Sequence, residues 1–121
     1  ATADSLARTY IIQVCCGEGV TDANLILARL WEQLGHRPNA LRALRRRSGG
    51  FLLGPLYIST FLREEGRLLA LSGDTTGAIR AYRHYLALRP DPEPIAQAEV
   101  AQVAQELATL VGQRGVARAS R

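Results

Sequence analysis

The side chains that could act in catalysis or bind a metal are few in this 121-residue chain, and they are scattered. Cys15 and Cys16 are adjacent, so they cannot close a disulfide loop around a core. A structural zinc site needs four Cys or His ligands, and His36 and His84 fall in separate helical patterns without metal-ligand spacing. The cysteine pair is therefore interpreted as two small buried hydrophobes, with a vicinal disulfide or a redox pair as the alternative.

The spacing of the other ionisable residues does not favour acid–base catalysis. Glu64 and Glu65 form an acidic pair, but neighbouring helical positions point in different directions and do not converge on one substrate atom. The same argument separates His84 from Tyr82 and Tyr85 and predicts a surface or half-buried structural histidine. We expect no catalytic residue, no cofactor, no metal ion and no small-molecule substrate, and hence a protein that is not an enzyme.

The basic residues are all arginines, and the chain carries a net charge of +4. Between Gln33 and Leu62 five arginines occur without an acidic residue, and Arg42, Arg45 and Arg46 share one helical face as a basic patch. Nucleic-acid binding would also require exposed aromatic side chains or a known reading motif, and the sequence has neither. The simplest interpretation of the basic patch is a solvated helix face, and the alternative is a binding site for an acidic protein. Nucleic-acid binding is disfavoured.

Two helical patterns, residues 55–71 and 74–88, contain the Glu64–Glu65 pair and His84 with its neighbouring tyrosines. Gly73 can adopt the left-handed conformation that ends a helix, and Asp74 can cap the helix that follows. Pro90 stops this second helix, because proline lacks an N–H group and disfavours helical geometry at the residue before it. Apolar residues three and four positions apart predict the buried faces. These residues are Ile58, Phe61, Leu62, Leu68 and Leu69 in the first pattern, and Ala78, Ile79, Tyr82, Tyr85 and Leu86 in the second.

A weaker copy of this hairpin precedes it. Thr21 or Asp22 can cap a helix over residues 23–34, Gly35 makes the turn, and a second helix runs from Pro38 to about residue 47. The residues expected to face inward are Leu25, Leu27, Ala28, Trp31, Leu34, Leu41 and Leu44.

The two turns indicate an internal repeat. Gly35 and Gly73 lie 38 residues apart, and an alanine follows each of them five residues later, Ala40 and Ala78. Gly66, in mid-helix, is expected to let a neighbouring helix approach closely. The second copy, residues 59–92, resembles a tetratricopeptide repeat at Gly66, Leu69, Gly73, Asp74, Ala78, Ile79, Tyr82, Leu86, Leu88 and Pro90. The first copy matches at Leu27, Ala28, Trp31, Gly35 and Ala40.

Further helical patterns flank the two hairpins. Before them, Leu6, Tyr10, Ile11 and Val14 form an apolar face. After them, an apolar stripe consists of Ala96, Val100, Val103, Leu107 and Leu110. Its opposite side is expected to carry Gln97, Glu99, Gln102, Gln105 and Glu106. Solenoids need such a terminal helix with one polar face.

The expected fold is all-α: a superhelix of two tetratricopeptide-like hairpins with one flanking helix on each side. Residues 1–20 form the N-terminal helix, a partial repeat, and residues 21–50 form the divergent hairpin. Residues 51–92 form the second hairpin with an apolar connector, residues 93–112 the capping helix and residues 113–121 a flexible tail.

The resemblance implies a role in protein–protein interaction. The first helix of each pair would line a concave groove and place Arg29, Glu32, Arg63 and Arg67 there. Three of these residues are arginines that could grip a carboxylate or an acidic peptide, although the Lys/Asn set of family members that clamp a C-terminal carboxylate is missing. The apolar segment 51–62, with Phe51, Leu52, Leu53 and Leu56, is a second candidate docking surface.

We therefore expect a non-enzymatic interaction module or scaffold whose partner is a protein. An acidic protein is one candidate. The alternative is a structural accessory subunit of a larger complex, one at a membrane surface included. A looser resemblance of residues 62–94 to the helical-repeat tails of bacterial serine/threonine kinases and transcriptional activators fits the first hypothesis. No segment reaches the roughly 20 apolar residues that span a bilayer, and no signal-peptide pattern is present. This favours the cytoplasm, or the periplasm if a leader has been removed.

Overall fold

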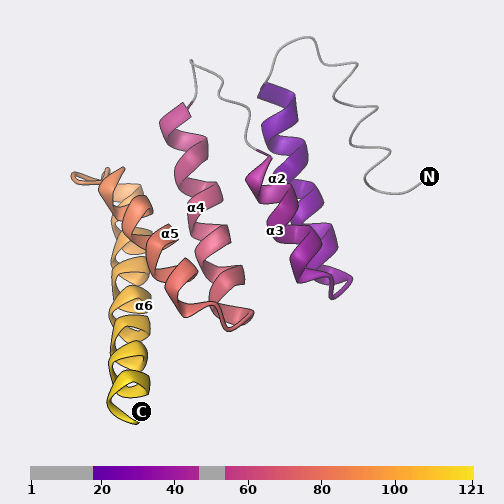
Figure 1. Cartoon of the computed structure of the whole chain (residues 1–121). Coiled ribbons are helices and arrows are strands. Elements are labelled where there is room, and N and C mark those ends of the chain that lie inside the picture. The colour runs from indigo at the N-terminus through magenta and orange to yellow at the C-terminus, as the bar shows by residue number, and fades with distance from the viewer. Residues whose placement is uncertain (1–17, 47–53) are drawn as a thin grey trace. The chain divides into compact units, whose positions relative to one another are not determined.

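The computed structural model describes residues 18–46 and 54–121, with the side chains of residues 23–46 and 58–121. Every regular element in these two stretches is an α-helix (Figure 1), so the all-α prediction is confirmed. The chain divides into two compact units, Ala1–Tyr57 and Ile58–Arg121, and the boundary falls near the start of a helix. The expected N-terminal helix and residues 47–53 of the connector lie outside the described residues.

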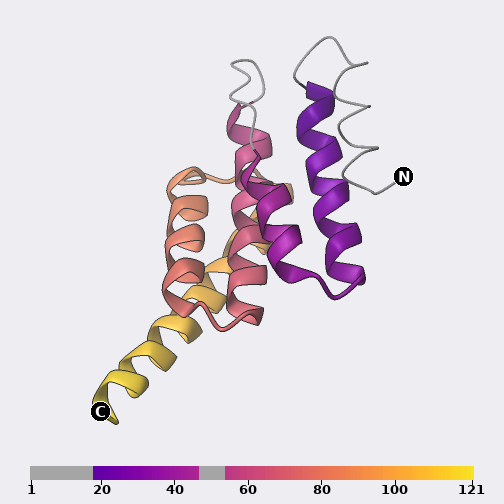
Figure 2. The same cartoon turned by 45° about the vertical axis from the view of Figure 1, so that its right-hand side comes forward.

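The first unit contains an antiparallel hairpin of α2, Glu18–Gln33, and α3, Arg37–Arg45 (Figures 1 and 2). Gly35 has a φ of +78°, in the left-handed region that favours glycine. The Gly35 N–H donates to the Glu32 carbonyl at 2.9 Å, and the His36 N–H donates to the Trp31 carbonyl at 2.8 Å. This pair of bonds is a Schellman motif, which satisfies carbonyl groups at the end of α2.

Small and aliphatic side chains form the core of the hairpin. Leu27 and Ala28 of α2 are buried, as predicted. On α3 the buried residues are Ala40, Ala43 and Leu44. Two predictions for α2 are wrong. The helix begins at Glu18 and not after a cap at Thr21 or Asp22, because the backbone already continues as a helix through these residues. Leu34, which directly follows the last residue of α2, is 64% exposed and does not face inward.

The second unit holds most of α4, Gly54–Leu71, together with α5, Thr75–Ala87, and α6, Pro94–Ala119. Gly73 has a φ of +83°, and the N–H groups of Gly73 and Asp74 donate to the carbonyls of Ala70 and Leu69. The turn thus repeats the Schellman pattern of the first hairpin. The Asp74 side chain accepts a hydrogen bond from the Gly77 N–H at 2.9 Å, which confirms it as the cap of α5.

The core of the second unit lies where the three helices meet. Leu62 of α4, Tyr82 and Tyr85 of α5 and Val103 of α6 are buried together. The apolar side chains around them are Ile58, Leu86, Val100, Leu107 and Leu110. A methyl group at Gly66 would collide with the Tyr82 ring, so the glycine in α4 does allow a close helix–helix approach.

α6 extends further than the sequence predicts. The helix continues to Ala119, whereas a flexible tail was expected from residue 113. Its last turns contain Gln, Arg, Ala and Val but no proline, so only the modest cost of Gly115 opposes helix formation there. Arg118 lies in the last turn, where a cation interacts favourably with the helix dipole.

Candidate functional site

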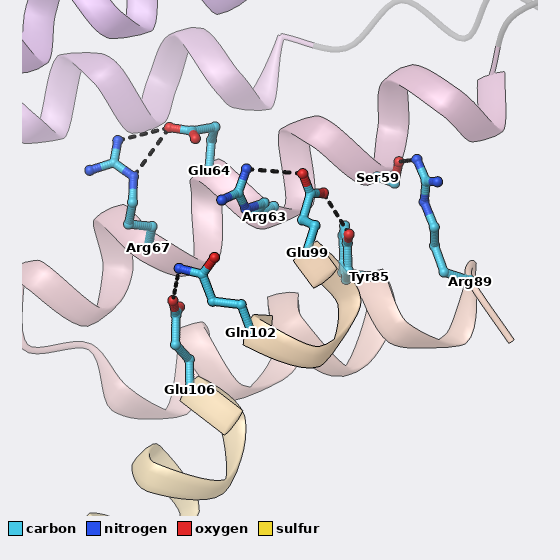
Figure 3. A network of polar contacts seen from close by, with 9 residues as sticks. All are labelled: Ser59, Arg63, Glu64, Arg67, Tyr85, Arg89, Glu99, Gln102 and Glu106. Atoms are coloured by element: carbon cyan, nitrogen blue, oxygen red, sulfur yellow. Dashed lines mark hydrogen bonds and ion pairs between the residues drawn. The ribbon is translucent and has the colours of Figure 1, made fainter. Parts of the chain in front are cut away.

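Polar side chains of the second unit gather where α6 meets α4 and α5 (Figure 3). Glu99 of α6 lies at the centre of this group. One of its carboxylate oxygens, Oε2, accepts from Arg63 Nη1 of α4 at 3.2 Å, and the other, Oε1, accepts from the Tyr85 hydroxyl of α5 at 2.6 Å. We name Arg63, Tyr85 and Glu99 the Glu99 cluster. One carboxylate therefore links three helices.

A second carboxylate on α6 makes a similar contact two turns further along. Glu106 Oε2 accepts from the Tyr82 hydroxyl at 2.6 Å, while Glu106 Oε1 accepts from Gln102 Nε2 at 3.1 Å. Tyr82 is the residue whose ring covers Gly66. The Tyr82 side chain thus contacts α4 through its ring and α6 through its hydroxyl.

Both tyrosine hydroxyls are held in the protonated form. Burial, the hydrogen bond to Glu99 and the charge of that carboxylate raise the pKa of Tyr85 to about 12, while Arg89 and Arg63 act in the opposite direction. Burial and Glu106 together raise the pKa of Tyr82 as well. The two hydroxyls therefore remain hydrogen-bond donors throughout the neutral pH range.

The sequence analysis placed Glu99 and Glu106 on the outer polar side of the last helix, and that prediction is wrong. Both glutamates are half-buried and hydrogen-bonded to tyrosines of α5. They stand four residues before and three residues after Val103, the buried residue of α6. Helical geometry places such neighbours on the same side. Their spacing from Val103 could have predicted that both glutamates lie on the buried side of the helix. They were assigned to the solvent side because they are polar.

Another contact links α4 to the residues just after α5. Arg89 Nη2 donates to Ser59 Oγ at 2.8 Å, and Arg89 Nη1 lies 3.5 Å from a carboxylate oxygen of Glu93. Ser59 is fully buried in α4. The hydrogen bond from Arg89 therefore satisfies a polar group that would be costly to bury alone.

Two of the three arginines expected in a groove have partners within the second unit. Arg63 pairs with Glu99, and Arg67 Nη2 lies 2.7 Å from Glu64 Oε2, one turn earlier on α4. Arg29 is exposed and Glu32 half-exposed on α2, which belongs to the first unit. The groove candidates thus belong to two different units, and the groove stays a prediction.

The other two candidate surfaces have different outcomes. Phe51, Leu52 and Leu53 lie outside the described residues, as does the side chain of Leu56. Downstream in the same apolar segment, Phe61 and Leu62 are buried, so they are not available for docking.

The basic patch is exposed on α3, as the helical spacing predicts. Arg42, Arg45 and Arg46 point away from the buried face, and Arg42 donates to Asn39 Oδ1. The carbonyl of Arg46 accepts from Nδ2 of the buried Asn24 at 2.9 Å, a contact the sequence did not reveal. The patch borders a shallow hollow that is far smaller than a typical ligand pocket.

An apolar surface on α2 was missed by the sequence analysis. Ile26, Leu30 and Leu34 are 58%, 45% and 64% exposed. They lie four residues apart, and the Leu34 N–H donates to the Leu30 carbonyl at 3.1 Å, which keeps Leu34 in line with the helix. We name these three residues the α2 stripe. The spacing by four was visible in the sequence, on the side of the helix away from the buried Ala28.

The described residues show no group of three or more His, Cys, Asp or Glu side chains that could hold a metal ion. No helix within residues 18–46 and 54–121 has the length and apolar content needed to cross a bilayer. Comparisons with protein-family models, curated proteins and solved structures found no match to the chain.

Proposed function

We propose that the chain is a non-enzymatic interaction module that binds a protein partner through the α2 stripe. The observation that carries the proposal is the exposure of Ile26, Leu30 and Leu34 along one line of a helix whose other side is already buried. Contiguous exposed apolar side chains commonly mark protein-interaction sites, whereas isolated ones have no such meaning. The three side chains are also spaced four residues apart, which is a spacing at which apolar anchors of one helix contact another helix.

The second unit supports this proposal as a rigid scaffold. Two of its half-buried ionisable side chains, Glu99 and Glu106, are engaged in contacts between helices. A carboxylate that accepts from Arg63 and Tyr85 is occupied in holding helices together, which suits a structural role.

Similarities between the two hairpins support a tetratricopeptide-like arrangement. Gly35 and Gly73 both have positive φ and both belong to a Schellman motif. Gly66 packs against Tyr82 as a small residue in the first helix of a repeat would. We propose on these grounds that the two hairpins are repeats of one structural unit, which is the usual architecture of helical scaffolds.

The decisive experiment uses the α2 stripe as the variable. The tagged full chain, the Ile26→Glu/Leu30→Glu variant and the Ile95→Glu variant are used to capture proteins from an extract of the organism that encodes the chain. Ile95 is a matched control, since it is an apolar residue 94% exposed on α6. We expect one partner to be retained by the wild type and the control but lost from the stripe variant, and purified partner to reproduce the result.

The proposal fails if the stripe variant, with an unchanged circular dichroism spectrum, retains the same proteins as the wild type. The alternative of a permanent subunit rests on the same exposed stripe. In that case the isolated chain should aggregate or lose its cooperative thermal transition, and it should recover both solubility and cooperativity when the other subunit is present. A module that binds reversibly should instead be monomeric and melt cooperatively by itself.

A further inference from the structure

We propose that the C-terminal end of α6 is a second protein-binding surface, and that it binds an acidic helix with Asp or Glu residues three and four positions apart. The surface consists of Arg114, Arg118 and Arg121, and we name it the α6 arginine face. It belongs to the second unit, whereas the α2 stripe belongs to the first, so each proposal can be tested separately.

The α6 arginine face continues the side of α6 that packs on the core. From the buried Val103, helical steps of four and three residues lead along this side to Leu107 and Leu110, which pack against the core. Further steps of four, four and three residues reach the three arginines. The Arg121 N–H donates to the Arg118 carbonyl at 3.5 Å, so Arg121 stays close to the end of the helix. Past the start of α5 (Figure 1), the side of α6 that is apolar within the core is therefore basic.

The arginines of this face have no partner among the described side chains. None of their guanidinium groups makes a hydrogen bond or an ion pair with a side chain of residues 23–46 or 58–121. By contrast, three other arginines of the same unit each pair with a glutamate: Arg63 with Glu99, Arg67 with Glu64, and Arg89 with Glu93. The helix dipole favours cations in the last turn, which gives a reason for Arg118 but not for Arg114, one turn earlier.

The charge at this surface favours an acidic partner. After Glu106 the chain has no acidic residue as far as Arg121, and α5 has none along its whole length. The acidic residue just before α5, Asp74, is engaged as the cap of that helix. Three positive charges thus lie within about 10 Å along α6, at 1.5 Å per residue. Carboxylates of a partner gain from this field in their rate of association and in selectivity.

The spacing of the arginines favours a helical partner. Residues at steps of four and three form a line on a helix, so Asp or Glu at the same steps on a neighbouring helix can pair with all three arginines. Ala117 is exposed and lies three residues after Arg114 and four before Arg121. Because this side chain is small, a partner helix can approach closely between the arginines. Each guanidinium can then donate two parallel hydrogen bonds to one carboxylate.

A nucleic acid or an anionic membrane fits this face less well. Proteins that bind single strands stack bases on aromatic side chains, and α6 has no aromatic residue. A long polyanion that follows α6 toward its start would also meet the carboxylates of Glu106 and Glu99. An interfacial helix needs a large apolar face opposite its charges, whereas Val111 and Val116 are the large apolar side chains exposed at this end.

The test uses two synthetic alanine-rich peptides of about 18 residues, a length that can form a helix on binding. One peptide carries glutamates at steps of four and three along one side, and the other carries lysines at the same positions. Fluorescence anisotropy measures the affinity of each labelled peptide for the full chain. We expect the glutamate peptide to bind about tenfold more tightly at low ionic strength, and the difference to shrink in high salt.

Charge-reversal variants then assign the binding to the α6 arginine face. Arg114→Glu/Arg118→Glu should reverse the preference, so that the lysine peptide binds about tenfold more tightly than the glutamate peptide. Arg83→Glu is the matched control, because Arg83 is exposed on α5 and is likewise without a partner among the described side chains. Its neighbour Tyr82 bonds to Glu106, which lies about 12 Å before Arg114 at 1.5 Å per residue. This control should change the affinity for the glutamate peptide by less than about twofold.

Several results would overturn the inference. Equal affinity of the wild type for the two peptides, or no binding of either, would refute an acidic helix as the partner. A loss in Arg83→Glu as large as that in the double variant, with unchanged circular dichroism spectra, would assign the binding to net charge instead. Tighter binding of an oligonucleotide or of phosphatidylserine vesicles, abolished in the double variant, would assign the face to that ligand. None of these results would change the outcome of the capture experiment on the α2 stripe.

Discussion

The hydroxyl of Tyr85 donates to Glu99 Oε1 at 2.6 Å, while the other oxygen of the same carboxylate accepts from Arg63. The two residues are 14 positions apart and belong to successive helices, α5 and α6. Since Tyr85 is buried in the core and Glu99 is half-buried at its edge, this bond joins the core of the second unit to the polar contacts around it.

Glu99→Ala should destabilise the protein by about 1–2 kcal/mol, because the buried Tyr85 hydroxyl loses its acceptor. The loss of the half-exposed Arg63 ion pair should add little. The free energy of unfolding from urea titrations measures the effect. Gln97→Ala, at an exposed position two residues earlier on α6, is the control and should change stability by less than about 0.5 kcal/mol. Equal effects of the two substitutions would show that the bond does not contribute.

Tyr82→Phe and Glu106→Ala should be coupled energetically. The Tyr82 hydroxyl donates to Glu106 at 2.6 Å, so the two single changes remove the same bond and the double variant should lose less than their sum, by about 1 kcal/mol. A double-mutant cycle in urea measures this coupling energy. Tyr85→Phe combined with Glu106→Ala is the comparison, because Tyr85 bonds to Glu99 instead. Additivity of the first pair would contradict the contact.

Gly66→Ala and Gly112→Ala should have opposite effects on stability. Both glycines lie inside helices, where alanine is favoured by about 1 kcal/mol. A methyl group at Gly66 would collide with the Tyr82 ring, so this substitution should cost about 1–3 kcal/mol. At Gly112 nothing lies near the new methyl group, and the melting temperature should rise. Stabilisation by Gly66→Ala would refute the close approach of α4 and α5.

Stability should fall between about pH 10 and pH 12. The pKa of Tyr85 is raised from 10.0 to about 12 in the folded chain, so the unfolded chain loses this proton first. Because the folded state then binds more protons than the unfolded state, the free energy of unfolding decreases as the pH rises through this window, and the contribution is fully present below pH 10. Urea titrations at several pH values measure the slope. Tyr85→Phe should reduce the slope without abolishing it, because the pKa of Tyr82 is also raised, and an unchanged slope in that variant would refute the assignment.

Local signals in the sequence were sufficient for the turns and the cap. Gly35, Gly73 and Asp74 act through bonds to residues within five positions of themselves, so their roles follow from residue type and spacing. Gly66 was also predictable, because a glycine in mid-helix is costly unless a neighbour requires the space.

The candidate site was predicted less well, because it depends on partners distant in sequence. Glu99 and Glu106 were assigned to the solvent side by polarity, yet their acceptor oxygens meet hydroxyls of the preceding helix. Leu34 shows the converse error, because it was expected to face inward and is exposed. Nothing in a single helical pattern states whether a second apolar face has a helix packed on it, and here that face is exposed.

α6 contacts the core of the second unit over a stretch much shorter than the whole helix. Among the residues of this helix, all of which the structure describes, Val103 alone is fully buried. Leu107 and Leu110 also pack on the core, and from Leu110 the helix continues past the start of α5 as far as Ala119 (Figures 1 and 2), about 14 Å further at 1.5 Å per residue. A rotation of about 10° around Leu110 would therefore move Ala119 by about 2 Å, given that rise per residue. Small rearrangements where α6 leaves the core are thus amplified at its C-terminal tip.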